Sequence, residues 1–214
     1  MNSDKEHKDK IGAGRPASTL QRMERMPLLL MMLYLGLVGI TVLFVVLLVA
    51  YARLRYTNGV PVGLQPFPRY FSLSTIVLLV SSYTISQAKR LYQQDDMANL
   101  VRCLGATLLL SSIFAGLQGL GWRELHTQGI LLDELGSDTL LYLISALHVV
   151  HLLGGMLFLL ALLLRTMHAS RDGVRTLVFI RNPYRRLQLH MITVYWHFID
   201  VLWVVLFATF LFLF

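Results

Sequence analysis

Five long apolar runs constrain this chain more than any other feature of its sequence. They span residues 27–50, 70–88, 100–120, 139–164 and 190–214. At 1.5 Å per residue, a helix needs about 20 apolar residues to cross the hydrocarbon core of a bilayer. Strands of a membrane barrel would be shorter, with alternating polarity. With 56% hydrophobic and only 14% charged residues, the chain is unlike a soluble domain. The pattern predicts an all-α integral membrane bundle of five transmembrane helices.

The polar residues before the first run predict a second, much smaller segment. Residues 1–26 are expected to form a mobile N-terminal tail, and residues 27–214 the membrane domain. No apolar stretch suited to a cleavable signal peptide is apparent in the tail. Cys103 is the only cysteine, which excludes an intrachain disulfide and a cysteine-based metal cage.

The charges of the loops predict an orientation. Loop 121–138 carries one arginine against four acids, whereas loop 165–187 carries six arginines against one acid. Basic loops stay in the cytoplasm, so the second of these loops is expected inside, the N-terminus inside and the C-terminus outside. Arg53, Arg55 and Arg69 conflict with this assignment, because it places their acid-free loop outside. The net charge of +7 is assigned to the loops and not to nucleic-acid binding.

Four ionisable side chains lie inside the last two runs. His148 and His151 are three residues apart on the fourth run, and His197 and Asp200 have the same spacing on the fifth. Measured from the inner side of a ~30 Å core, His148 and Asp200 lie at depths of about 17 and 15 Å, and His151 and His197 at about 12 and 10 Å. The two pairs are therefore expected at matching depths if the two helices touch.

Three interpretations of these residues remain open at this point. Histidines on facing helices could bind haem, buried ionisable groups could relay protons, or the four groups could satisfy one another and join two helices. The residues alone favour the third, a structural intramembrane polar network. Gly154 and Gly155 are expected to let the helices approach closely, and Gln118 to bond a neighbouring helix.

Basic residues beyond the inner end of the fourth run are candidates for contacts with lipid phosphates. They are Arg165, His168, Arg171 and Arg175. A solvated basic loop is the alternative. The sequence contains no phosphate-binding Gly-rich loop, zinc-protease motif or Ser/His/Asp set.

The segment YWHFIDVLWVVLF at 195–207 closely resembles the C-terminal signature of subunit III of the haem-copper respiratory oxidases. Residues 147–155, LHVVHLLGG, are similar to that family's H-G-L-H-V-x-x-G region, with Val-Val in place of Gly-Leu. Phe114 and Gln118 resemble an F-L-x-x-Q segment, and SSYTISQA at 81–88 resembles the preceding hydroxyl-rich helix. The resemblance covers about residues 27–214, and five spans are typical of the family's short bacterial form.

The resemblance implies a non-catalytic subunit III of a proton-pumping terminal oxidase in the bacterial inner (cytoplasmic) membrane. Such a subunit holds no haem or copper, which belong to subunit I. It packs against subunit I, supports its stability and proton uptake, and binds phospholipid. Two features depart from the family: the first run has no carboxylate, and Gly121 stands where a Glu is usual. The alternatives are a small haem-binding membrane cytochrome and a proton channel or transporter.

Overall fold

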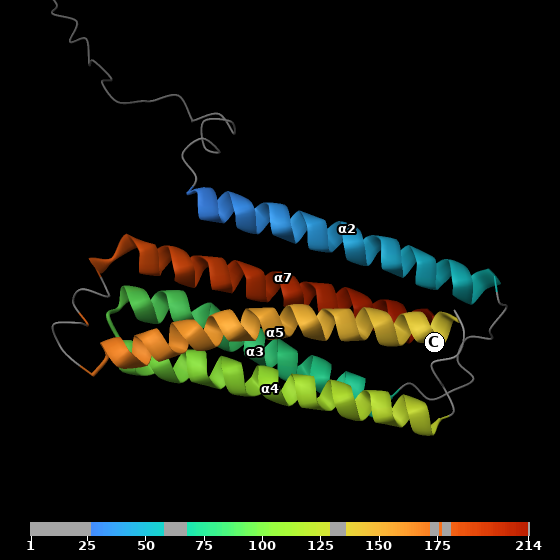
Figure 1. Ribbon diagram of the computed structural model, residues 1–214. Coiled ribbons are helices and arrows are strands. Elements are labelled where there is room, and N and C mark those ends of the chain that lie inside the picture. The colour runs from blue at the N-terminus through green and yellow to red at the C-terminus, as the bar shows by residue number, and fades with distance from the viewer. Residues whose placement is uncertain (1–26, 58–67, 129–135, 172–175, 177–180, 214) are drawn as a thin grey trace, which may run out of the picture.

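The computed structural model describes residues 27–57, 68–128, 136–171, 176 and 181–213 of the 214-residue chain. Five long helices lie within these ranges: α2 (Leu28–Thr57), α3 (Arg69–Gln93), α4 (Met97–Thr127), α5 (Ser137–Ala169) and α7 (Pro183–Leu213) (Figure 1). All five are long and apolar enough to cross a membrane. The predicted all-α bundle of five spans is therefore confirmed. The predicted N-terminal tail, 1–26, lies outside the described residues.

Each helix extends beyond its apolar run at one end or both. Helix α3 continues past residue 88 through Lys89 and Arg90, both exposed, to the buried Tyr92. Helix α7 begins at Pro183, seven residues before its apolar run. Backbone N–H and C=O groups near the membrane surface still need hydrogen bonds, and a continued helix provides these bonds. Long charged side chains on the extended part can reach towards water. Hydropathy therefore marks the part of each helix inside the hydrocarbon and not the helix ends.

A tight turn joins α3 to α4. Asp95 has a φ of 58°, a left-handed conformation that Asp tolerates better than most residues. Asp96 then caps α4, because its side chain accepts a hydrogen bond from the backbone N–H of Asn99 at 3.1 Å. A link this short makes the two helices antiparallel neighbours.

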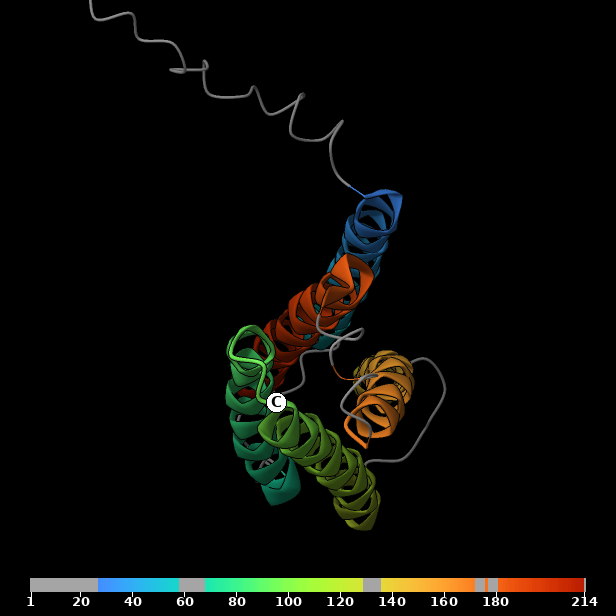
Figure 2. The same ribbon diagram turned by 90° about the vertical axis from the view of Figure 1, so that its left-hand side faces the viewer.

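Helices α3, α4, α5 and α7 form a ring, and α2 lies outside it. Helix α3 packs on α4 and α7, and α5 completes the ring by packing on the same two helices. Helix α2 packs on α5 and α7 (Figure 2). The ring therefore encloses an interior, and the predicted intramembrane polar residues are expected to face it.

Large aromatic side chains fill part of that interior. The ring of Trp203, on α7, meets Phe114 of α4 at a centroid distance of 5.2 Å and Phe71 of α3 at 6.1 Å. All three side chains are fully buried. Because lipid is as apolar as these residues, tight packing, rather than escape from water, stabilises such contacts in a membrane.

Helix α2 touches the ring along one narrow seam. Its buried apolar residues are Leu30, Leu37, Phe44 and Tyr51, which recur every seven residues. Phe44 meets the ring of His151 on α5 at 5.6 Å, and Tyr51 meets Phe210 on α7 at 5.5 Å. The other sides of α2 expose leucine, valine and methionine to the surroundings.

Candidate functional site

Two tryptophans on α7 donate hydrogen bonds to hydroxyl groups on α3. The indole Nε1 of Trp196 donates to Ser81 Oγ at 3.0 Å, and that of Trp203 donates to Thr75 Oγ1 at 2.9 Å. A buried indole N–H usually needs such a partner. The tryptophans were not singled out from the sequence as helix contacts. Their spacing of seven residues, on a span beside a hydroxyl-rich one, was the available signal.

Polar side chains also join α4 to its two neighbours in the ring. The amide Nε2 of Gln118 donates to Ser74 Oγ on α3 at 2.9 Å. The indole of Trp122 donates to Ser145 Oγ on α5 at 3.0 Å. The structure thus places Gln118 in a helix-to-helix hydrogen bond, and hydroxyls serve as the acceptors at both contacts.

The four predicted network residues do not hydrogen-bond one another in the described part of the chain. His197 Nδ1 lies 2.8 Å from Ser82 Oγ on α3, and His151 Nδ1 lies 2.7 Å from a carbonyl oxygen one turn back on its own helix. Both ring nitrogens of His148 and both carboxyl oxygens of Asp200 lack a hydrogen-bond partner among the described residues. The expectation that the four satisfy one another is corrected by this geometry. Depth along a helix sets the level of a side chain but not its direction around the axis.

Ring contacts hold His148 in place instead. Its imidazole is fully buried and lies 4.9 Å from the Trp203 ring on α7 and 5.8 Å from the Phe114 ring on α4, measured between centroids. The other histidine of α5, His151, accepts at its carbonyl oxygen a 2.8 Å hydrogen bond from the Tyr195 hydroxyl. Helices α5 and α7 therefore do touch at the level of the histidines, through aromatic partners.

The paired glycines of α5 have different surroundings. An added Cβ at Gly155 would lie 2.7 Å from Cε1 of Tyr195, whereas one at Gly154 would meet nothing within 4 Å. Gly155 is buried and Gly154 exposed. The predicted close approach to α7 thus involves Gly155 and not Gly154, because adjacent residues on a helix point in different directions.

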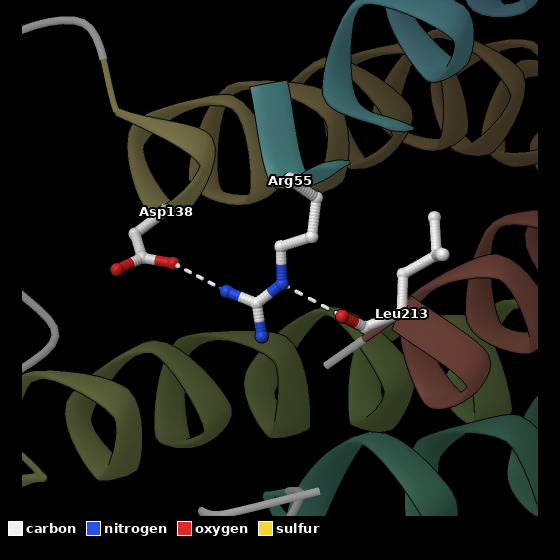
Figure 3. Close-up of polar contacts among 3 residues, drawn as sticks. All are labelled: Arg55, Asp138 and Leu213. Atoms are coloured by element: carbon white, nitrogen blue, oxygen red, sulfur yellow. Dashed lines mark hydrogen bonds and ion pairs between the residues drawn. The ribbon is translucent and has the colours of Figure 1, made fainter. Parts of the chain in front are cut away.

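An arginine that the loop count had placed in the first loop lies inside the protein. Arg55 is on α2, only 7% exposed, and its Nε donates to the carbonyl oxygen of Leu213 at the end of α7, at 2.7 Å. Its Nη1 lies 3.4 Å from Asp138 Oδ1 at the start of α5 (Figure 3). The C-terminal end of a helix carries partial negative charge, so both partners stabilise the guanidinium. Arg55 of α2 thus contacts α5 and α7 and is not a solvent-exposed arginine of the first loop.

The candidate lipid contacts lie at the other end of α5. Arg165, His168 and Arg171 are exposed there, and Arg175 lies outside the described residues. Among the residues that the structure describes, no group of three or more His, Cys, Asp or Glu side chains is placed to hold a metal ion.

The comparison with known proteins assigns these helices to a family. The family model described as cytochrome c oxidase subunit III matches residues 31–213, which include nearly the whole of all five helices. The chain belongs to the cytochrome c oxidase subunit III family. Cytochrome c oxidase subunit 3 of Bacillus sp. (strain PS3) is 32% identical over 179 residues, 82% of this chain and 80% of that protein. The subunit of Bacillus subtilis (strain 168) is 29% identical over 182 residues, 82% of this chain and 81% of its own.

Membership of the subunit III family makes this chain a multi-pass membrane protein and part of an oxidase complex. The segment 195–207, which carries the resemblance, contributes the middle of the buried face of α7. Trp196, Ile199, Asp200 and Trp203 are each at most 3% exposed. The pattern of the motif therefore follows from helix geometry, since residues three and four apart share one face.

Proposed function

We propose that this chain is a subunit of a haem-copper terminal oxidase that performs no redox chemistry itself and stabilises the catalytic subunit I. The observation that carries the proposal is the family match over residues 31–213. The hydrogen bonds support it, because the indoles of Trp196, Trp203 and Trp122 and the amide of Gln118 all bond neighbouring helices. Such contacts are suited to a rigid supporting subunit.

The haems and copper are assigned to subunit I, as the family resemblance implies, and none to this chain. Subunit I reduces oxygen to water in aerobic respiration, and this subunit is its neighbour in the membrane. Helix α2 has no carboxylate. A role in proton uptake that depends on a carboxylate in the first span is therefore not assigned to this chain.

The proposed location is the bacterial inner (cytoplasmic) membrane, with the N-terminus inside and the C-terminus outside. The arginine-rich loop 165–187 supports this orientation. This orientation places the arginines of the first loop outside, against the charge rule. The ion pair between Arg55 and Asp138 reduces that conflict, because Arg55 no longer counts as a free charge of the loop. Without Asp138, loop 121–138 still carries three acids against one arginine.

Phospholipid is the second proposed partner. Arg165, His168 and Arg171 are exposed at the proposed cytoplasmic end of α5, where cationic side chains can meet lipid phosphates. Arg175 is proposed as a fourth contact from the sequence alone.

Purification of the tagged chain from its own membranes tests the proposal. In a mild detergent, the chain is expected to co-purify with a haem-containing subunit I and with oxygen-consuming activity. After separation in a harsher detergent, the isolated chain is expected to show no haem absorption. An untagged strain, treated in the same way, provides the control for non-specific binding.

Three results would overturn the proposal. A Soret band that stays with the isolated chain would indicate a membrane cytochrome. Proton flux into liposomes that contain this chain alone would indicate a channel or transporter. Failure of any oxidase subunit to co-purify, with the five-span chain intact, would remove the proposed partner.

A further inference from the structure

Asp200 is a buried carboxyl group that forms no well-aligned hydrogen bond with the described residues. It lies near the middle of α7, 17 residues after Pro183 and 13 before Leu213, or about 26 and 20 Å along the axis from the two ends. Its side chain is only 3% exposed. Neither of its oxygens meets a hydrogen-bond partner in the described part of the chain. The polar group is thus kept from water without the bonds that normally accompany burial.

The polar side chains near Asp200 on α3 and α7 form hydrogen bonds with other partners. Ser82 lies beside the Asp200 carboxyl, but its hydroxyl makes its short contact, 2.8 Å, with His197 Nδ1 and forms no well-aligned hydrogen bond with Asp200. One turn further along α7, the indole N–H of Trp203 bonds Thr75. The short hydrogen bonds of these polar groups are thus made to partners other than Asp200.

No cation compensates Asp200 either. Within the residues that the structure describes, no ion pair includes this carboxyl group. Helix α3 carries its charged residues only near its ends. In the central parts of α5 and α7, the side chains that can carry a positive charge are His148, His151 and His197. His151 and His197 bond other groups, and His148 has no hydrogen-bond partner among the described residues.

Asp138 provides a contrast within the same chain. Its side chain is 41% exposed, lies in the first turn of α5 and is 3.4 Å from the Arg55 guanidinium. Partial access to water, a helix N-terminus and a cation all favour a carboxylate. Asp200 has none of these three, and an isolated charge away from water is strongly disfavoured.

We propose that Asp200 is held inside the membrane as a neutral carboxylic acid and not as a carboxylate. Burial of a neutral carboxylic acid removes only uncharged polar groups from water, which costs less than burial of a carboxylate. The O–H of the acid can also rotate towards any acceptor that is present. Asn has nearly the same shape and no charge. Asp200→Asn is therefore expected to leave assembly unchanged, which distinguishes this proposal from one in which a negative charge is required.

Infrared spectroscopy of the purified complex at neutral pH tests the protonation state. The wild-type minus Asp200→Asn difference spectrum is expected to show the C=O stretch of a protonated carboxyl group, shifted to lower frequency in D₂O. The matched control, wild type minus Asp138→Asn, is expected to show the carboxylate stretch. Protonated acids in other subunits cancel in both differences.

A carboxylate band in the Asp200→Asn difference spectrum would overturn the proposal. Failure of Asp200→Asn to assemble would also overturn it, because the neutral replacement should be tolerated. The test does not depend on the identity of the partners, since co-purification of subunit I is read separately from the infrared bands.

Discussion

Among single residues, Gly155 is one of two glycines in the described helices, with Gly121, at which an added Cβ would lie 2.7 Å from a neighbouring aromatic ring. A Cβ at Gly155 would lie 2.7 Å from Cε1 of Tyr195 and 3.5 Å from Trp196. The Tyr195 hydroxyl is anchored by its 2.8 Å hydrogen bond to the carbonyl of His151. The ring therefore cannot move aside without losing that bond, and α5 and α7 approach closely only because this residue is glycine.

Substitution of Gly155 should accordingly destabilise the protein. Gly155→Ala is expected to cost about 1–3 kcal/mol, the usual range for overpacking a filled interior, and to lower the melting temperature in detergent. Gly154→Ala is the matched control, because nothing lies within 4 Å of its added Cβ. Equal melting temperatures for the two variants would contradict the contact between α5 and α7 described above.

The partners of single polar residues were the least predictable part of the site. The positions of His197 and Asp200 along the fifth run predicted their level in the membrane, but His197 bonds Ser82 on α3, and Asp200 forms no well-aligned hydrogen bond with a described residue. Sequence spacing does not reveal how α7 is rotated against its neighbours. Arg55 was assigned to a loop because charge counting assumes contact with water, and its partners come from the distant ends of α5 and α7.

At the scale of the helix, the start of α4 depends on Asp96. Its carboxylate accepts hydrogen bonds from the backbone N–H of Asn99 at 3.1 Å and from its side-chain amide at 2.6 Å. These bonds hold the pKa of the Asp96 carboxyl below its ordinary value. A carboxyl group with a lowered folded-state pKa stabilises the fold above its unfolded pKa, and this contribution is lost as the pH falls through the folded value.

The stabilisation that the Asp96 cap gives to α4 should therefore be lost at acid pH. Asp96→Ala is expected to lower the melting temperature at neutral pH, whereas Asp96→Asn retains most of the stability because Asn is also a good cap. As the pH falls below about 4, the advantage of the wild type over Asp96→Ala is expected to shrink. An advantage that stayed constant across this range would show that the ionised carboxylate is not what stabilises the turn.

Arg55 determines how firmly α2 is attached. Arg55→Met keeps much of the side-chain length and removes the hydrogen bonds to Asp138 and to the Leu213 carbonyl. The expected loss is about 2 kcal/mol, because the bonds involve a charged group but Asp138 is partly exposed to solvent. The melting temperature of the detergent-solubilised protein measures this loss.

Arg53→Met is the control for Arg55→Met, since Arg53 lies on the same helix and is exposed. It should melt like the wild type. If both variants melted like the wild type, the cluster of Arg55, Asp138 and Leu213 would not stabilise the attachment of α2.

For the whole molecule, the number of spans was predictable, whereas their arrangement was not. A bilayer demands about 20 apolar residues per helix, so each of the five spans is visible in the sequence. The ring of α3, α4, α5 and α7 depends on side chains that meet across helices, such as Trp203 with Phe114 and Phe71. Apolar runs contain no information on which faces meet.

The orientation of the whole bundle can be tested by cysteine labelling. In a chain with Cys103→Ser, single cysteines replace Arg171 or His126, which are exposed at opposite ends of the bundle. An impermeant maleimide is expected to label His126→Cys in spheroplasts and Arg171→Cys only in inverted vesicles. The reverse pattern would contradict the proposed inside location of the N-terminus, and detergent-solubilised samples control for reactivity.

The seven-residue seam of α2 has a consequence for how this helix finds its axial position. Because the contacts at Leu30, Leu37, Phe44 and Tyr51 repeat at equal intervals, a slide by one repeat, about 10 Å, would place apolar residues opposite apolar residues again. Arg55 breaks this degeneracy, since only one position brings its guanidinium to both Asp138 and the end of α7. A single buried charge thus selects one register for an otherwise repetitive helix.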